Sequence, residues 1–174
     1  MRLGLLSLGT AAVLFLHGLL GAAAVAKDND VFISPGATAP VPGEPPKARG
    51  RTFVPLHSTV IAGGGRTRLN FSGSLSVHNT SASHVLVIDA IEFYDASGRL
   101  VQAYVSQPIG LRPFASMQVP IAQEDIRGGI GPGFVVDWSS FDPSEEPAIE
   151  AVMIANQGTQ GYSFVSPGRR ITRP

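Results

Sequence analysis

The sequence contains no cysteine. This absence excludes disulfide bridges, thiol catalysis and lipid attachment at a cysteine. A small exported domain without disulfides must be stabilised by its hydrophobic core, and about 120 folded residues are enough to form one. Charge is also scarce, since 15% of the 174 residues are charged, against about 25% in a typical soluble domain.

The few charges balance, with 13 Lys plus Arg and 13 Asp plus Glu. A balanced, sparsely charged chain lacks the concentrated basic face that binds nucleic acid, so we expect no nucleic-acid partner. Basic residues gather over 47–68 and 169–173, and acidic residues over 137–150. We interpret these groups as solvated loops, with a charged docking site as the alternative.

Residues Met1 to Ala26 have the features of a bacterial secretory signal peptide. Arg2 supplies a positive charge, residues 3–20 are mostly apolar, and Ala24 and Ala26 form an A-x-A cleavage signal. An uncleaved N-terminal anchor is the alternative, because the apolar stretch reaches about 23 residues. We expect cleavage, and therefore a periplasmic or secreted protein. We expect no stable membrane insertion afterwards, since no second apolar stretch is long enough to span a bilayer.

Residues 27–50 are predicted to be a Pro-rich linker, because residues 34–46 contain five prolines. Residues 51–174 are predicted to be the folded domain. The high content of glycine (20) and proline (14) favours short strands and tight turns over helices.

From residue 51 onward, short runs of β-forming residues alternate with turn residues. In Leu69 to His78, apolar and polar residues alternate, as in a strand with one buried face. His84 to Asp95 is apolar on both faces for much of its length, which indicates a central strand. The predicted strands cover residues 52–62, 69–78, 84–95, 99–105, 114–122, 133–139, 148–156 and 161–166. The fold class is therefore all-β: one antiparallel β-sandwich of about eight strands, immunoglobulin/fibronectin-like, with Trp138 in its core.

The order of several motifs resembles a bacterial family catalogued as domain of unknown function 3124. The resembling segments are FVPLHS (53–58), LSVHNT (75–80), FYDASG (93–98), FVVDW (134–138), IEAVMI (149–154) and QGTQGYSFVS (157–166). Members of this family are typically exported or lipid-anchored, which agrees with the signal peptide, although this chain lacks the cysteine of the anchored members. No activity is established for the family, so the resemblance implies no functional residue.

Three histidines of the mature chain, His57, His78 and His84, are weak candidates for metal ligands. With Met117 and Met153 they could form a copper or zinc site, since copper accepts soft and borderline ligands such as these. No two of them have a close ligand spacing such as H-x-H. The alternative is that the histidines lie on the surface and the methionines in the core, and we expect no cofactor.

Carboxylates form no catalytic pair within one predicted strand. Asp89 and Glu92 point to opposite faces because they are three residues apart. Asp137 or Glu150 could approach Asp89 only from a neighbouring strand. Their expected role is a structural polar network, with Arg99 or Arg112 as partners, and Asp95 is expected to form a turn. Three acids in one pocket would instead indicate an enzyme.

The loop formed by Gln157, Gln160 and Tyr162 is a possible partner-binding loop, with a simple turn as the alternative. Together these observations predict a non-enzymatic binding or structural module of the bacterial envelope. Its partner would be an unknown protein or envelope component, contacted through loop tips or an exposed edge strand. A periplasmic copper- or zinc-handling protein is the alternative, and an envelope hydrolase is the least favoured reading.

Overall fold

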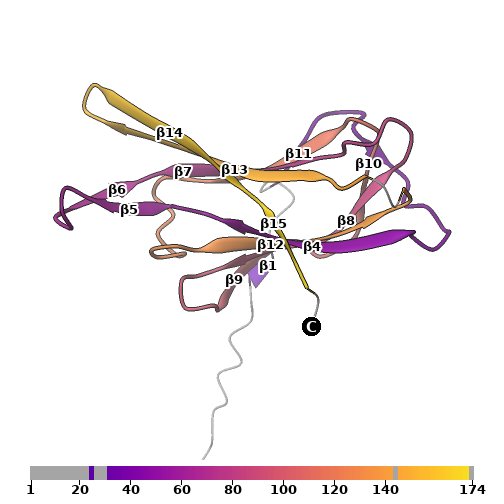
Figure 1. Ribbon diagram of the computed structural model, residues 1–174, viewed down its shortest axis with the longest axis horizontal. Coiled ribbons are helices and arrows are strands. Elements are labelled where there is room, and N and C mark those ends of the chain that lie inside the picture. The colour runs from indigo at the N-terminus through magenta and orange to yellow at the C-terminus, as the bar shows by residue number, and fades with distance from the viewer. Residues whose placement is uncertain (1–23, 26–30, 143–144, 173–174) are drawn as a thin grey trace, which may run out of the picture.

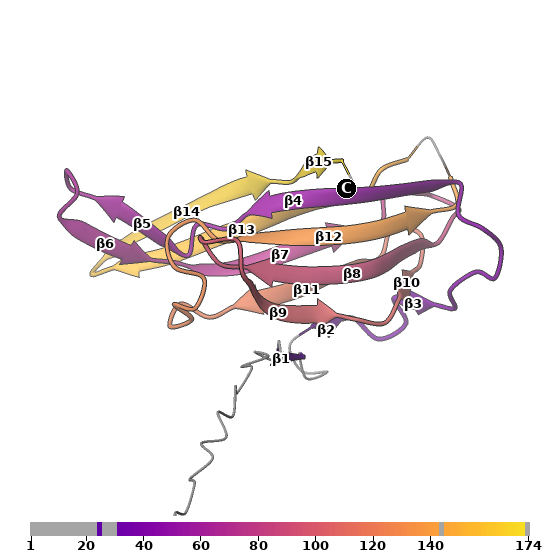
Figure 2. The ribbon, with the colours of Figure 1, turned by 90° about the horizontal axis from the view of Figure 1, so that it is seen from below.

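The computed structural model describes residues 24–25, 31–142 and 145–172. Within these ranges the chain forms strands and turns, and two sheets pack face to face (Figures 1 and 2). The fold is an antiparallel β-sandwich, as the sequence predicts. Most of the expected signal peptide lies outside the described residues. In the part of the chain described, no helix is long and apolar enough to span a membrane.

The first sheet, called sheet A here, has six strands in line and two more at one edge. The line is β1 (Ala24–Val25), β9 (Leu100–Val105), β8 (Leu86–Tyr94), β12 (Gly133–Ser140), β4 (Ala48–Pro55) and β15 (Arg169–Ile171). Beside β8 lies β10 (Ile109–Leu111), and beside β10 lies β3 (Thr38–Ala39). β8 is therefore a central strand, as predicted.

The second sheet, called sheet B, has five strands. Their order is β14 (Gln160–Pro167), β13 (Ala148–Gln157), β7 (Ser72–His78), β11 (Ser116–Ile121) and β2 (Phe32–Ile33). A separate two-stranded hairpin consists of β5 (Thr59–Ala62) and β6 (Thr67–Asn70). This hairpin and the β13–β14 hairpin extend beyond the sandwich at the same end (Figure 1).

The core lies between the two sheets and takes the alternate apolar residues of each strand. Fully buried side chains from sheet A include Ile91, Phe93, Phe134 and Trp138, and those from sheet B include Leu75, Val77, Met117 and Met153. Burial of each such side chain contributes about 1.5–3 kcal/mol. This core stabilises the fold without disulfides, and Trp138 and both methionines occupy it.

Trp138 determines what its neighbour on β4 can be. Its indole Nε1 donates to Thr52 Oγ1 at 3.1 Å, and its ring lies over Gly50, the residue paired with it across the sheet. A Cβ added at Gly50 would lie 2.1 Å from Trp138 Cζ2. The guanidinium of Arg170 lies 5.4 Å from the ring centroid, as in a cation–π contact.

Two predicted strands are each divided in the structure. Residues 52–62 give β4 and β5, and residues 69–78 give β6 and β7, because the chain moves from the sandwich into the projecting hairpin and back. Pro55 is the last residue of β4, and β15 pairs only with residues 51–53 of that strand. The edge of β4 is therefore open at Pro55, and the missing N–H interrupts no ladder there.

Residues 31–47 lie along the sandwich, whereas a linker is expected there. β2 pairs with β11 of sheet B, and after four intervening residues β3 pairs with β10 of sheet A. The Arg112 N–H donates to the Ala37 carbonyl at 2.9 Å, and the Lys47 N–H donates to the Ser140 carbonyl at 2.9 Å. Strand pairing is possible because β2 and β3 contain no proline, so their N–H groups are available. We call residues 31–47 the strap.

Candidate binding surfaces

The three histidines lie on different parts of the molecule. His57 is exposed after β4, and its ring lies 5.6 Å from the ring of Phe164 on β14. His78 is exposed at the end of β7, opposite Ala148. Since Phe164 pairs with Met153, five residues further along β13 than Ala148, about 17 Å of strand separates these places.

His84 lies in the turn that follows β7. Its Nδ1 is 2.9 Å from Ser83 Oγ and 3.5 Å from Asp142 Oδ2. The described residues contain no group of three or more His, Asp or Glu side chains placed to hold a metal ion. The structure therefore does not bring His57, His78 and His84 together, and Met117 and Met153 lie in the core.

Of the three acids of the enzyme alternative, Asp89 and Asp137 lie on neighbouring strands, but Glu150 is separated from both. Asp89 and Asp137 lie on the outer face of sheet A, and Glu150 lies on the outer face of sheet B, across the whole sandwich. Asp95 forms a turn as expected, since its Oδ1 accepts hydrogen bonds from the N–H groups of Ser97 and Arg99. No described pocket includes Asp89, Asp137 and Glu150 together.

Asp137 takes part in a polar cluster on sheet A that the sequence does not assign correctly. Its partner is Arg51 of the neighbouring β4, which donates through Nε at 2.9 Å and Nη2 at 2.6 Å. This hydrogen-bonded pair raises the pKa of Arg51. Beside it Tyr94 donates to Glu92 at 2.8 Å, and burial followed by this bond raises the Tyr94 pKa.

The arginine partners expected from the sequence lie elsewhere. Arg99 pairs with Asp95 at 3.0 Å, and Arg112 donates from Nε to the Thr38 carbonyl at 3.0 Å. Arg51 is the cross-strand neighbour of Asp137, because the register of β4 against β12 pairs these two residues. Strand order and register set this pairing, and neither can be derived from one sequence.

The loop of Gln157, Gln160 and Tyr162 is a tight β-hairpin. Gln157 pairs with Gln160 across a two-residue turn in which Gly158 has φ +60°. Tyr162 is 38% exposed, and its hydroxyl donates to Gln160 Oε1 at 2.8 Å. The side chain of Gln157 lies outside the described part of the structure. The two candidate side chains that are described thus bond to each other at the tip of the projecting hairpin.

One edge of β14 is unpaired. In an antiparallel ladder, pairs that exchange hydrogen bonds alternate with pairs that do not. The pair that flanks the two-residue turn, Gln157 and Gln160, is a hydrogen-bonded pair. Counting along the ladder makes Ile149 and Gly168 a hydrogen-bonded pair too, and the Gly168 N–H does donate to the Ile149 carbonyl. Consequently, the N–H and C=O groups of Gly161, Ser163 and Val165 point away from β13, toward this free edge.

The free edge carries no charge. β14 reads QGYSFVSP, with no Lys, Arg, Asp or Glu. Natural edge strands usually carry such charges, or bulges or prolines, to prevent pairing with other chains. Other strands of the described part have their edges covered. β15, which contains two arginines, pairs with the edge of β4, and the strap pairs with the edges of β11 and β10. Only Pro167, at the end of β14, is a protecting residue.

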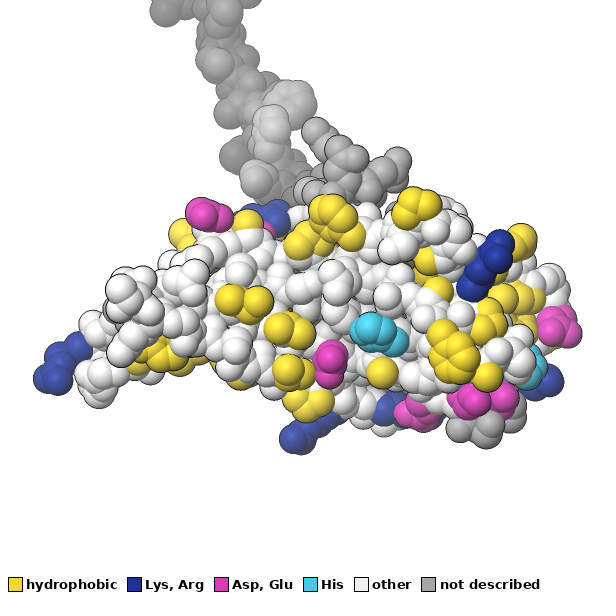
Figure 3. All heavy atoms as spheres, turned by 90° about the horizontal axis from the view of Figure 1, so that it is seen from above, with side chains coloured by type: hydrophobic (Ala, Val, Ile, Leu, Met, Phe, Trp, Pro, Cys, Tyr) yellow, Lys and Arg dark blue, Asp and Glu magenta, His cyan; other side chains and the backbone are white. Residues whose placement is uncertain are grey.

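Apolar side chains lie beside this edge on the outer face of sheet B. Val165 is 53% exposed and pairs with Val152, and Ile154 is 51% exposed two residues further along β13. The next strand presents Ser72 and Ser74. Figure 3 shows this face with mostly uncharged side chains and apolar groups among them. We call Val152, Ile154 and Val165 the β14 patch.

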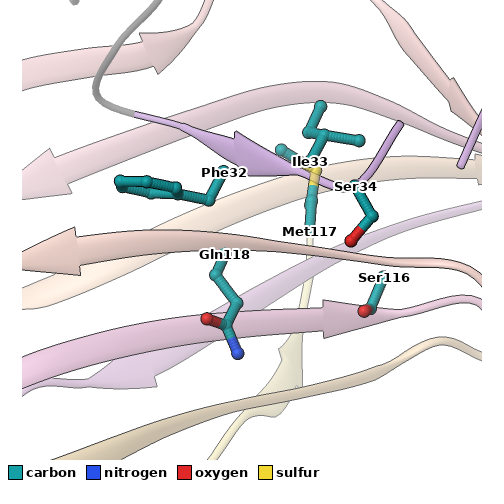
Figure 4. A pocket seen from close by; sticks show the side chains of 6 residues that line it. All are labelled: Phe32, Ile33, Ser34, Ser116, Met117 and Gln118. Carbon is teal, nitrogen blue, oxygen red and sulfur yellow. The ribbon is translucent and has the colours of Figure 1, made fainter. Parts of the chain in front are cut away.

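A shallow hollow lies at the opposite edge of sheet B, where β2 meets β11 (Figure 4). Its volume is about 380 Å³, and it is lined by Phe32, Ile33, Ser34, Ser116, Met117 and Gln118. Phe32 is 61% exposed, whereas Ile33 packs against the core next to Met117. β2 covers only two residues of β11, so this edge is closed along part of its length.

The molecule is thus a β-sandwich whose candidate sites are an open strand edge, an exposed face and shallow hollows. Residues 49–171 match the family model described as "Protein of unknown function (DUF3124)". The match covers more than half of the chain, and the chain belongs to this family. No curated protein matches the sequence significantly.

One solved structure that matches this chain is "Crystal Structure of Thermotoga maritima 1070". The two chains share 12% sequence identity with a TM-score of 0.40. The similarity covers 69% of this chain and 92% of the Thermotoga maritima chain.

Sequence reasoning missed the β14 patch, although part of the signal is present. In residues 160–167 the uncharged composition is visible, and residues 151–154 form a continuous apolar run. Those features alone cannot distinguish an edge strand from an inner one, since both can be apolar on two faces. The structure identifies β14 as an edge strand because it lies at the end of sheet B.

Proposed function

We propose that this protein is an exported, non-enzymatic binding module that holds an extended segment of a partner protein as an added strand beside β14. The supporting observation is the free edge itself, formed by backbone groups of Gly161, Ser163 and Val165 with no charge along the strand. Backbone hydrogen bonds would supply affinity, and contacts of alternate side chains with the β14 patch would supply selectivity.

The chemistry of the partner segment follows from what surrounds the edge. The β14 patch is apolar, and the adjacent Ser72 and Ser74 are uncharged. Glu150 lies on the same face of β13, two residues before the patch begins. Away from the end of the patch near Glu150, a charged segment would lose solvation without gaining a counter-charge. The matching segment is therefore extended and uncharged, with apolar residues at every second position to contact Val165 and Ile154.

A flexible segment fits this edge better than a rigid second copy of the chain. The free edge from Gly161 to Val165 is about 16 Å long, and beyond it β14 contacts β4. A strip of this length and one strand wide is too small for the roughly 1,000 Å² that a specific rigid interface buries. An extended segment can instead follow the edge and also cover the β14 patch.

This proposal can be tested by selecting peptides from a random display library for binding to the immobilised chain. The expected peptides are uncharged, with apolar residues at alternate positions. On binding, the amides of Gly161, Ser163 and Val165 should become protected from hydrogen exchange. Selected peptides that lack this alternation, or that protect amides elsewhere, would contradict the proposal.

Two substitutions at the edge provide the variants. Ser163→Pro removes an N–H that points to the partner and leaves the ladder with β13 intact, and Val165→Lys adds a charge to the edge. Each is expected to weaken peptide binding at least about tenfold, a change of 1.4 kcal/mol. Ser116→Lys, on the same face but at the β11 edge, is the control and should bind as the parent does.

Analytical ultracentrifugation of the chain without peptide distinguishes a partner segment from a second copy of the chain as the occupant of the edge. The proposal predicts a monomer. A dimer that Ser163→Pro dissociates would show that a second copy occupies the edge, and would overturn the assignment of a partner segment.

A further inference from the structure

A β-bulge on the outer face of sheet A places one carboxylate in an unusual position. Asp137 pairs with Ala90 and Trp138 pairs with Ile88, so Asp89 between them has no partner on β12. Such an extra residue locally re-aims side chains, and bulges are frequent at functional sites. Here the bulge sets Asp89 beside Ser139 of β12 and Arg49 of β4.

A hollow of about 310 Å³ opens over these three residues. Its outer wall is the strap, where Val41, Pro42, Glu44, Pro45 and Pro46 line it, and Val87 and Phe141 form the apolar part of its floor. Three prolines make this wall stiff, because each fixes its own φ. The hollow is therefore largely pre-formed, which reduces the entropy lost when a ligand binds.

The polar groups of the floor have capacity left for a ligand. Asp89 Oδ2 accepts from Ser139 Oγ at 2.5 Å and lies 3.9 Å from Arg49 Nη1. No hydrogen bond is made to Asp89 Oδ1 within the described part of the chain. The Asp89 side chain is 25% exposed and that of Arg49 is 53% exposed. An ion pair so long and so exposed contributes little, so each group can turn to a ligand instead.

We propose that this hollow binds a small zwitterion with a compact aliphatic body, of the α-amino acid type. The ligand ammonium would contact Asp89 Oδ1, and its carboxylate would contact the Arg49 guanidinium, which presents a planar pair of donors. The aliphatic body would lie between the prolines and Val87. The volume is at the lower end of that of small-molecule sites, which limits the ligand to a few heavy atoms.

Calorimetric titration of the purified full chain with L-alanine, L-valine and L-proline tests this site. At least one is expected to bind saturably in the millimolar range or tighter. Isobutylamine and isobutyric acid each carry only one of the two charges. Each should bind at least about tenfold more weakly, because the loss of one hydrogen bond to a charged group lowers the affinity by about that factor. Absence of saturable binding by all three amino acids would overturn the proposal, as would an amine that binds as tightly.

Asp89→Asn and Arg49→Gln should each lower the affinity for the bound amino acid at least about tenfold. Arg66→Gln, at the exposed turn of the β5–β6 hairpin, is the matched control and should leave the affinity unchanged. Fluorescence of Trp138 verifies that each variant is folded. The amide resonances of Val41, Gly43, Glu44 and Asp89 should shift on titration. Shifts confined to another part of the sandwich would contradict the assigned place.

This site and the β14 edge lie on different sheets, so either can fail without the other. Ser163→Pro should leave amino-acid binding unchanged, and Asp89→Asn should leave peptide binding unchanged. Loss of amino-acid binding in Ser163→Pro would place the ligand elsewhere than the Asp89 hollow.

Discussion

Replacing Gly50 by alanine tests how closely the core packs around Trp138. The new Cβ would lie 2.1 Å from Cζ2 and 2.3 Å from Cε2 of a ring that is 1% exposed. Non-bonded carbons approach to about 3.5–4.0 Å, so the ring must move by roughly 1.5 Å. Such a movement would break the bond from Nε1 to Thr52 Oγ1, which is 3.1 Å long.

The expected loss of stability combines three effects. Overpacking a tight core costs about 1–3 kcal/mol, and leaving the indole N–H buried without an acceptor costs about 1–3 kcal/mol. Alanine restricts the unfolded chain more than glycine does, which offsets about 0.4–1 kcal/mol. We therefore expect Gly50→Ala to lower the free energy of unfolding by about 2–4 kcal/mol.

Urea unfolding followed by Trp138 fluorescence and far-UV circular dichroism measures this change. With a slope of about 2 kcal/mol per molar urea, the midpoint should fall by about 1–2 M. Gly43→Ala is the matched control, since a Cβ there meets nothing within 4 Å, and its midpoint should stay or rise slightly. If Gly50→Ala is as stable as Gly43→Ala, the reasoning about the Trp138 contact is refuted.

Three further predictions concern polar groups. Asn79→Ala should cost about 2–4 kcal/mol in urea unfolding, because the Nδ2 of this 4% exposed residue contacts three backbone carbonyls and its Oδ1 accepts from Ser81; the exposed Asn156→Ala should change stability by less than about 0.5 kcal/mol. Asp137→Asn should destabilise the fold by about 1–3 kcal/mol, and less in an Arg51→Gln background, which a double-mutant cycle measures; additive effects would contradict a coupled pair. Hydrogen bonds from Ser97 and Arg99 hold the pKa of Asp95 well below its ordinary value of 3.8, so its contribution to stability is present above that pH and is lost as the pH falls below it. Asp95→Asn should therefore flatten the acid side of the stability curve, and an unchanged curve would contradict this role.

The sequence predicts the fold well where alternation is local. Leu75 and Val77 face the core and Ser74 faces solvent, as the pattern of β7 indicates. The clean turn at Asp95 is equally local, because its side chain bonds to backbone groups two and four residues later. Such features depend on neighbours in the chain, and neighbours are visible in one sequence.

Features that depend on strand order were not predictable in the same way. Arg51 and Asp137 are 86 residues apart and meet only because β4 lies beside β12. The bulge at Asp89 arises from the register between β8 and β12. The five prolines of the strap predict a linker, yet the proline-free pairs Phe32–Ile33 and Thr38–Ala39 join the sheets.

The strap also has a mechanical consequence. A pulling force applied from the N-terminal side acts first on β1, β2 and β3, which hold the sheets by only two residue pairs each. These short ladders would open before the eight paired residues that join β4 to β12. Once open, the 17 residues of the strap could extend to about 55–60 Å. Under load the strap would therefore detach and extend while the sandwich stays folded, so the N-terminal connection would lengthen before the domain unfolds.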